Sequence, residues 1–213
     1  MYLGLCTRPD ILHAVVKLSQ FNNSYSMQHW QYLMRILRYL KGSQDFCLQF
    51  QKSAMKNDLI GFADADWGND PVDRKSYSGY CSKLDECPIS WSSKKHKCVS
   101  LSSAEAEYVS LTAAAKEAVF LRRLFIELTR CVTLEPTIIY NDSQSAQKMA
   151  HNPVFHDRTK HIDIQFHFIR DSIKDKKVIV KYQCTKDMPA DFLTKPVPKD
   201  KHVFCRTELK LSV

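Results

Sequence analysis

Apolar residues recur at steps of three and four in two segments near the N-terminus, a spacing typical of amphipathic helices. Residues 8–21 carry Ile11, Val15 and Leu18 on this spacing, and residues 28–41 repeat the pattern. We expect the two helices to form a small unit of about fifty residues, which buries too little surface to be stable alone.

After this unit, the pattern changes to short runs typical of strands, and helices separate the later ones. The expected elements are strands at 59–66, 77–83 and 88–93, a helix from 102 to about 130, a strand at 137–142, helices at 143–150 and 161–174, a strand at 177–183, and a last helix beginning near Asp187. Adjacent strands favour hairpins, whereas strands separated by helices favour parallel pairing. The sequence therefore predicts an α/β fold with a five-stranded mixed sheet, three antiparallel strands followed by parallel ones, flanked by helices.

Acidic residues follow two of the expected strands. The apolar run 59–62 leads into Asp64 and Asp66, which share one face because side chains alternate along a strand. Asp142 ends the strand at 137–142 in the same way. If the two strands are neighbours, these acids lie side by side at the strand ends, where ligands bind in open α/β sheets. Asp142 also suits a second role, as the N-cap of the next helix.

The long helix carries a glutamate on its apolar face. Glu107 lines up with Leu111 and later apolar residues, whereas Glu105 lies on the solvated face and has capping-box spacing with Ser102. Because buried carboxylates close together cannot all stay ionised, this pattern indicates a bound cation or a proton. Asp191 taken alone is explained as an acid in the first turn of the last helix, where the helix dipole favours negative charge.

The chain is basic, with 31 Lys and Arg against 23 Asp and Glu among 213 residues. This balance suits a polyanionic partner, nucleic acid before an acidic membrane surface. A run of lysines also fits a solvated face. The basic residues best placed for phosphate contacts are Arg74, Lys75, Lys94, Lys95 and Lys97.

The eight cysteines show neither Cys-x-x-Cys spacing nor a zinc-type grouping with histidine. We therefore expect reduced, mostly buried thiols in a cytoplasmic or nuclear protein that is not secreted. No apolar run is long enough for a signal peptide or a membrane span, so no membrane partner is expected.

Seven motifs occur between about residues 58 and 200, namely ADADW, DRKSYSGY, PISWSSKK, LSSAEAEYVSL, NDSQSA, KHIDIQFHFIR and PADFLTKP. In order and spacing they closely resemble the ribonuclease H domain of copia-type retrotransposon Pol polyproteins. TRPDILHAV and HWQYLMRILRYLKG resemble the end of the same family's reverse transcriptase. The resemblance thus implies a helical reverse-transcriptase remnant at 1–50, a ribonuclease H-like domain at 58–200 and a tail at 201–213. We expect a piece of a longer polyprotein, normally joined to an upstream reverse transcriptase.

The resemblance also implies four metal-binding carboxylates, carried over by motif. They are Asp64 of ADADW, Glu107 of AEAEY, Asp142 of NDSQ and Asp191 of PADFLTK. Strand geometry leaves Asp64 and Asp66 equivalent, and the family pattern favours Asp64. The chain departs from the family at DWGND and LDECP, both in turns away from the four acids.

The activity implied by the family is hydrolysis of the RNA strand of an RNA–DNA hybrid with two Mg²⁺ ions, for which Mn²⁺ can substitute. In this hypothesis Asp64 bridges both ions, Asp142 completes one site, and Glu107 and Asp191 complete the other. RNA selectivity requires contacts to the 2′-hydroxyl, for which the candidates are Asn141, Ser143 and Gln144.

His161 is a candidate accessory residue that moves a proton or aids product release, although the residue type and its setting favour a structural histidine. Two alternative functions remain open. A decayed element would leave an inactive module that only binds nucleic acid or another protein. A nuclease of the same fold would instead cut duplex DNA. An active element is expected in a cytoplasmic virus-like particle or in the nucleus.

Overall fold

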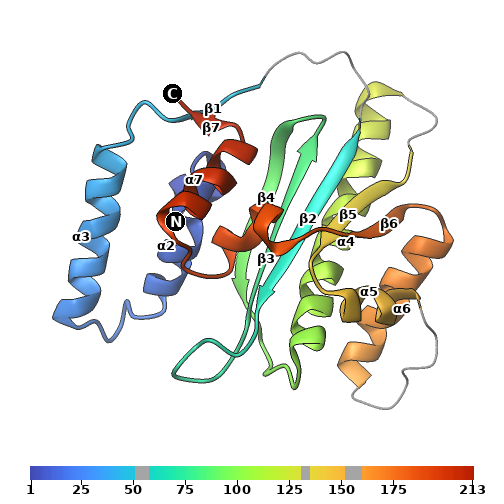
Figure 1. The fold of residues 1–213 in the computed structure, drawn as a ribbon, viewed down its shortest axis with the longest axis horizontal. Coiled ribbons are helices and arrows are strands. Elements are labelled where there is room, and N and C mark those ends of the chain that lie inside the picture. Colours follow the sequence, from blue (N-terminus) through green and yellow to red (C-terminus); the bar gives the residue numbers. More distant parts are fainter. Residues whose placement is uncertain (51–57, 131–134, 152–159) are drawn as a thin grey trace.

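The computed structural model describes residues 1–50, 58–130, 135–151 and 160–213, with 160–166 described by their backbone only. Its centre is a five-stranded sheet in the order β4-β3-β2-β5-β6 (Figure 1). The strands are β2 (Leu59–Asp66), β3 (Tyr77–Leu84), β4 (Cys87–Lys95), β5 (Thr137–Asn141) and β6 (Val178–Tyr182). β2, β3 and β4 pair antiparallel, whereas β5 and β6 are parallel to β2. The predicted mixed sheet is confirmed.

One face of this sheet is covered by helices from the middle of the chain. They are α4 (Ser103–Thr129), α5 (Gln144–His151) and α6 (Lys160–Lys174). The apolar stripe of α4, including Leu111, packs on Ala63 of β2 and Ile139 of β5, and Ile169 of α6 completes this core. The alternation along β2 therefore turns Ala63 toward α4 and its neighbours toward the other face.

Helix α4 begins at the predicted position, with Ser102 as its N-cap. The Ser102 hydroxyl accepts a hydrogen bond from the backbone N–H of Glu105 at 3.1 Å. The Glu105 carboxylate accepts from the backbone N–H of Leu101 at 2.8 Å rather than from that of Ser102. The capping box is therefore modified, and Glu105 ties down the loop that leads into the helix.

Segments from both ends of the chain lie on the opposite side of the sheet (Figure 1). The α-helices there are α1 (Tyr2–Cys6), α2 (Leu12–Ser19), α3 (Met27–Lys41) and α7 (Lys199–Glu208), and the 3-10 helices are η1 (Pro9–Ile11), η2 (Thr185–Asp187) and η3 (Pro189–Leu193). Leu12 of α2 joins Leu193 and Leu209 in a second buried cluster around Phe62 of β2.

The two ends of the chain are also tied to each other. The short strands β1 (Cys47–Leu48) and β7 (Leu211–Ser212) pair antiparallel. Residues 1–50 therefore share a core and a strand pair with the C-terminal segment, and the boundary placed at residue 200 falls inside α7. The division into a remnant, a domain and a tail stays a prediction.

The last helix begins later than predicted. Residues 185–193 form the short 3-10 helices η2 and η3, and α7 begins only at Lys199. Pro189 disfavours a helical conformation for Met188, whose ψ is 108°, so the chain cannot continue as a helix there. Asp191 therefore does not lie in the first turn of an α-helix, and the dipole of such a helix does not explain its position.

The cysteines are less buried than predicted. Cys81 and Cys205 are free thiols and are buried. Four others are exposed because they lie in the N-terminal segment or in loops, namely Cys6, Cys47, Cys98 and Cys184. Within the described ranges, none of the helices has the length and apolarity that crossing a lipid bilayer requires.

Gly79 of β3 allows η3 to approach the sheet closely. A Cβ at this position would lie 2.7 Å from Cβ of Leu193 and 2.7 Å from Cγ2 of Thr194, closer than carbon atoms pack. We predict that Gly79→Ala lowers the free energy of unfolding by about 1–3 kcal/mol, because η3 must shift. Urea unfolding measures this change.

The matched control is Gly42→Ala, since a Cβ there meets no atom closer than 3.5 Å and the φ of Gly42 is −81°. We expect this control to be as stable as the unaltered chain or slightly more stable. Equal stability of Gly79→Ala and the unaltered chain would contradict the close packing of η3.

Candidate active site

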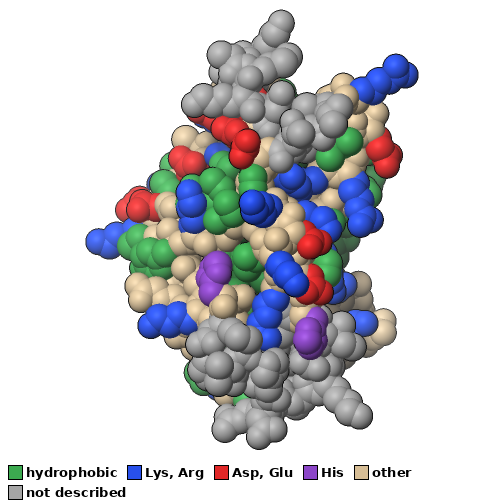
Figure 2. Space-filling model, turned by 90° about the vertical axis from the view of Figure 1, so that its right-hand side faces the viewer, with side chains coloured by type: hydrophobic (Ala, Val, Ile, Leu, Met, Phe, Trp, Pro, Cys, Tyr) green, Lys and Arg blue, Asp and Glu red, His purple; other side chains and the backbone are tan. Residues whose placement is uncertain are grey.

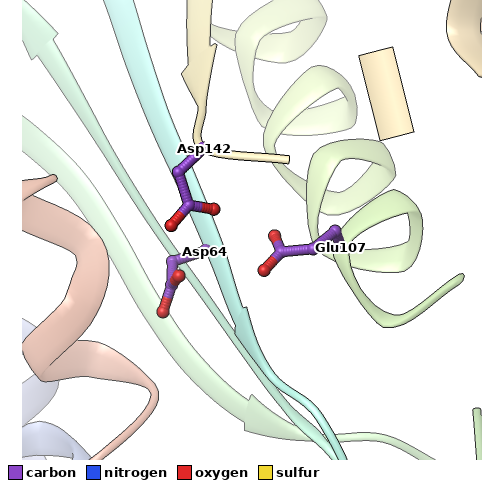
Figure 3. Close-up of side chains that lie close together, drawn as sticks. All are labelled: Asp64, Glu107 and Asp142. Carbon is purple, nitrogen blue, oxygen red and sulfur yellow. The ribbon is translucent and has the colours of Figure 1, made fainter. Parts of the chain in front are cut away.

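Three carboxylates from separate elements converge at one end of the sheet. Asp64 lies near the end of β2, Glu107 lies in α4 and Asp142 follows β5. Each offers an oxygen, and these oxygens lie within 4.8 Å of one another. In Figure 3 the carboxylates of Asp142 and Glu107 are directed toward Asp64. The pairing of Ala63 with Asn141 in neighbouring parallel strands brings the next residues, Asp64 and Asp142, side by side, as expected.

Asp64 is buried and fixed by several contacts. Its side chain is 1% exposed, and the Lys195 ammonium lies 3.2 Å from its carboxylate. The Ser110 hydroxyl donates to the Asp64 backbone carbonyl at 2.6 Å. The Thr194 hydroxyl donates to the Asp64 carboxylate. The carboxylate therefore has little freedom to rotate.

The geometry separates Asp64 from Asp66, which strand periodicity alone left equivalent. Asp66 is only half-buried and accepts a hydrogen bond from the Asn69 side chain at 2.9 Å. It lies one pleat further along β2 and outside the group of three acids. Asp64 is therefore the aspartate of β2 that joins the cluster.

Asp142 does not cap the following helix. The backbone N–H of Ala146 donates to the Ser143 hydroxyl at 3.1 Å, so the side chain of Ser143 caps the N-terminus of α5. The Asp142 carboxylate instead accepts a hydrogen bond from the Thr185 hydroxyl at 2.7 Å. The alternative role for Asp142 is thus excluded, and its carboxylate is directed to the cluster.

Glu107 is held by a buried asparagine. The Asn141 side chain donates to the Glu107 carboxylate at 2.9 Å and to the backbone carbonyl of Ala63 at 3.0 Å. Asn141 is fully buried. Its amide group therefore donates inside the protein and orients Glu107, and its contact with the 2′-hydroxyl of a substrate stays a prediction.

Asp191 lies outside the group of three and is paired with two cations. Its side chain is 3% exposed, with the Lys195 ammonium 2.9 Å from Oδ1 and the Lys201 ammonium 3.0 Å from Oδ2. Lys195 thus links Asp191 to Asp64. The role of Asp191 as a metal ligand stays a prediction.

Several residues that contact the acids were missed in the sequence. Lys195 stands four residues after Asp191, a spacing that pairs opposite charges on helices, so it could have been noticed. Thr194 and Lys201 contact the acids only through the tertiary fold, and nothing local in the sequence signals them.

The cluster is electrostatically strained without a cation. Burial raises the pKa of Asp64 to about 6, against the opposing effect of Lys195. Burial, followed by the charges of Asp64 and Asp142, raises the pKa of Glu107 to about 9. Burial alone would lower the pKa of Lys195, but Asp64 and Asp191 raise it above its ordinary value. The metal-free site therefore retains protons that a divalent cation would displace.

The donor set fits a hard divalent cation. The ligand atoms of Asp64, Glu107 and Asp142 are all carboxylate oxygens, which Mg²⁺ and Mn²⁺ prefer, whereas zinc favours nitrogen and sulfur. Burial is the first cause of the raised pKa values of Asp64 and Glu107, and the neighbouring carboxylates raise both further. The arrangement is thus compatible with divalent metal binding.

No family model matches the sequence. The chain is 42% identical over 206 residues to the retrovirus-related Pol polyprotein from transposon TNT 1-94 of Nicotiana tabacum, covering 97% of this chain and 15% of that protein. It is 44% identical over 193 residues to the Pol polyprotein from transposon RE1 of Arabidopsis thaliana, covering 91% of this chain and 13% of that protein. The chain belongs to the retrovirus-related Pol polyproteins of transposons.

This Pol polyprotein segment spans only 13–15% of the length of these two relatives. Among solved structures, RNase H1 from Halobacterium salinarum is similar with a TM-score of 0.47 and 13% identity, over 64% of this chain and 94% of that protein. That likeness is too distant to assign a function, which must come from the site.

The basic residues of the Pol polyprotein segment fall into two groups. Lys95 lies 2.9 Å from Asp70 and 2.9 Å from Asp73, and Lys75 lies 3.5 Å from Asp73. These lysines are paired within the protein, so the arrangement does not support their predicted phosphate contacts. Arg74 is exposed on the same loop, in the left-handed region with φ 57°.

Lys94 and Lys97 form the second group and are exposed. With Lys116 they line a groove of about 670 Å³ between β4 and α4. On the face drawn in Figure 2, Lys and Arg side chains are spread among acidic and apolar ones. Charge alone therefore does not mark a binding surface on that face. In the groove four lysines outnumber two acids, Glu105 and Glu117, so it is the better-defined basic feature.

Two predicted residues, Gln144 and His161, remain to be described. Gln144 is exposed directly after Asp142 and Ser143. His161 belongs to α6, but its side chain lies outside the described part of the structure. The accessory role suggested for His161 stays a prediction.

The raised pKa of Glu107 gives the metal-free chain a pH-dependent stability. An unperturbed glutamate titrates near 4.5, whereas Glu107 in the folded chain titrates near 9. The folded chain binds the Glu107 proton more tightly than the unfolded chain does. The resulting contribution to the free energy of unfolding is complete below pH 4.5 and is lost as the pH rises toward 9. We predict that Glu107→Gln removes this fall in the free energy of unfolding, as measured by urea titrations in EDTA from about pH 5 to about pH 9.

Glu105→Gln is the matched control, because Glu105 lies outside the acidic cluster on the same helix. It should retain the pH dependence of the unaltered chain. A pH dependence that is the same with and without the Glu107 carboxylate would contradict the raised pKa.

Proposed function

We propose that this segment is a ribonuclease H-type endonuclease, which hydrolyses the RNA strand of RNA–DNA hybrids with divalent metal ions. The observation that carries the proposal is the convergence of Asp64, Glu107 and Asp142 from two strand ends and a helix. Membership of the Pol polyproteins supports it, since a retroelement must remove RNA from hybrids made during reverse transcription. The nuclease class of enzyme follows from both.

The metal ions would be held by Asp64, Glu107 and Asp142, with Asp191 as the proposed fourth ligand. When bound, two Mg²⁺ or Mn²⁺ ions supply an activated water and neutralise charge on the scissile phosphate. Because no side-chain nucleophile is required in such chemistry, the protein contributes mainly by placing carboxylates accurately.

The placement depends on hydrogen bonds around each acid. Ser110 fixes the backbone of Asp64 and Thr194 fixes its carboxylate. The Asn141 side chain fixes one Glu107 oxygen by donating to it. Each carboxylate therefore enters the site with its rotation already restricted, which reduces the entropy lost on binding a cation.

Lys195 supplies positive charge beside the acids. Its side chain is 29% exposed, so the ammonium is accessible from solvent while it contacts Asp64 and Asp191. We propose that it lowers repulsion between these carboxylates and faces a phosphate of the substrate. Lys94 and Lys97 would hold phosphates further along the duplex, and Gln144 would contact the RNA strand beside the acids.

We predict that Asp64→Asn abolishes Mg²⁺-dependent cleavage of RNA in an RNA–DNA hybrid while leaving the fold intact. The amide keeps the shape of the side chain but removes the negative charge that a metal ion requires. Cleavage of a labelled hybrid on a denaturing gel measures the effect. Asp66→Asn is the matched control and should cut at a rate close to that of the unaltered chain.

Normal cleavage by Asp64→Asn would overturn the site. If the unaltered chain binds hybrids but does not cut them, the alternative of an inactive nucleic-acid-binding module is favoured. Faster cleavage of duplex DNA than of the hybrid would show that the substrate class is wrong.

The basic groove makes a separate prediction. We predict that Lys94→Gln combined with Lys97→Gln weakens hybrid binding and reduces the slope of log affinity against log salt by about 1–2, because up to two phosphate contacts are lost. Fluorescence anisotropy at several salt concentrations measures both quantities. Lys41→Gln, an exposed lysine at the end of α3, is the control and should leave the slope unchanged. An unchanged slope in the double variant would exclude the groove.

A further inference from the structure

Helix α7 places a lysine behind the acidic cluster, beyond the last of the sequence motifs. The Lys201 ammonium lies 3.0 Å from Oδ2 of Asp191 and donates to the backbone carbonyls of Thr185 and Lys186, each at 2.7 Å. All three donors of the ammonium therefore have an acceptor. Its side chain is only 17% exposed and its charge lies over the Phe204 ring.

These acceptors connect Lys201 to two of the acids. Asp191 is contacted directly. Thr185, whose carbonyl accepts from Lys201, donates its own hydroxyl to the Asp142 carboxylate at 2.7 Å. One largely enclosed ammonium thus joins the turn behind Asp142 to the segment η3 that carries Asp191.

Lys195 and Lys201 contact different sides of Asp191. Lys195 contacts Oδ1 and also Asp64, so it belongs to the cluster itself. Lys201 contacts Oδ2, and its two hydrogen bonds to other residues go to backbone carbonyls. Lys201 is therefore placed to support the site from behind, without facing the centre of the three acids.

We propose that Lys201 is a positioning residue for the metal site, acting through Asp191 directly and through Thr185 on Asp142. This inference rests on the proposed function, because it assumes that the carboxylates bind divalent ions. Residues around metal ligands commonly set metal affinity by orienting those ligands. Loss of the ammonium would leave Asp191 buried with one fewer partner and release the turn that holds Asp142.

The test compares Lys201→Met with Lys199→Met in the full 213-residue chain, with Mn²⁺ as the probe. Lys199 is exposed on the same helix and makes none of these contacts, so its variant is the matched control. Isothermal titration should show Mn²⁺ affinity about 10- to 100-fold weaker for Lys201→Met and unchanged for Lys199→Met. Lys201→Arg, which keeps the charge and several donors, should recover most of the loss.

A second pair of variants covers the case in which Lys201→Met does not fold, as judged by circular dichroism. Thr185→Val should weaken Mn²⁺ binding, whereas Thr185→Ser, which keeps the hydroxyl, should not. Equal affinity for Lys201→Met and the unaltered chain overturns the proposal, as does equal affinity for both Thr185 variants when Lys201→Met is unfolded.

Failure of the proposed function gives a different result. An unaltered chain that binds no Mn²⁺ overturns both the metal site and the role of Lys201. An unaltered chain that binds Mn²⁺ but does not cut hybrids overturns the nuclease alone, while the affinity differences at Lys201 still support its positioning role.

Discussion

Electrostatic repulsion among three clustered carboxylates, two of them buried, is the constraint on which this structure depends. Oxygens of Asp64, Glu107 and Asp142 lie within 4.8 Å of one another, and burial with their mutual charge raises the pKa of Glu107 to about 9. Apolar residues at these positions would pack without such an electrostatic cost. The cluster therefore lowers the stability of the fold, a cost common at functional sites, and the proposed binding of a cation would offset the repulsion.

The sheet makes this arrangement available because its two faces are built by different parts of the chain. Glu107 reaches the site from α4 on one face, whereas Asp64 is contacted by Thr194 and Lys195, which follow η3 on the other. The segment η3 packs on α2 and α7 in the second core. The geometry around Asp191 consequently depends on both ends of the chain, including residues that the motifs assign to the reverse transcriptase.

Much of the sheet and of the acidic cluster could be predicted because periodicity reports which side of an element a residue occupies. The two-residue period placed Asp64 and Asp142 at neighbouring strand ends, and the helical period placed Glu107 on the buried stripe. The same reasoning could not separate Asp64 from Asp66, because both share a face and only their depth in the site differs. The contrast between a half-buried Asp66 and a buried Asp64 appears only in three dimensions.

Other features were beyond sequence reasoning for identifiable reasons. The last helix begins later than the apolar pattern predicts because Pro189 restricts Met188 to an extended conformation. The contacts of Asn141 and Lys201 join residues from different elements, so no local spacing in the sequence predicts these contacts. The sequence around Lys95 does not indicate an ion pair, because its partners Asp70 and Asp73 lie in the loop between β2 and β3.

The most direct test of the account is the anomalous scattering of Mn²⁺ soaked into crystals of this chain. The account predicts anomalous density in contact with the carboxylates of Asp64, Glu107 and Asp142, in the space that the three side chains face. Well-ordered crystals at saturating Mn²⁺ that show no anomalous peak at these carboxylates, or peaks only elsewhere on the molecule, would contradict it.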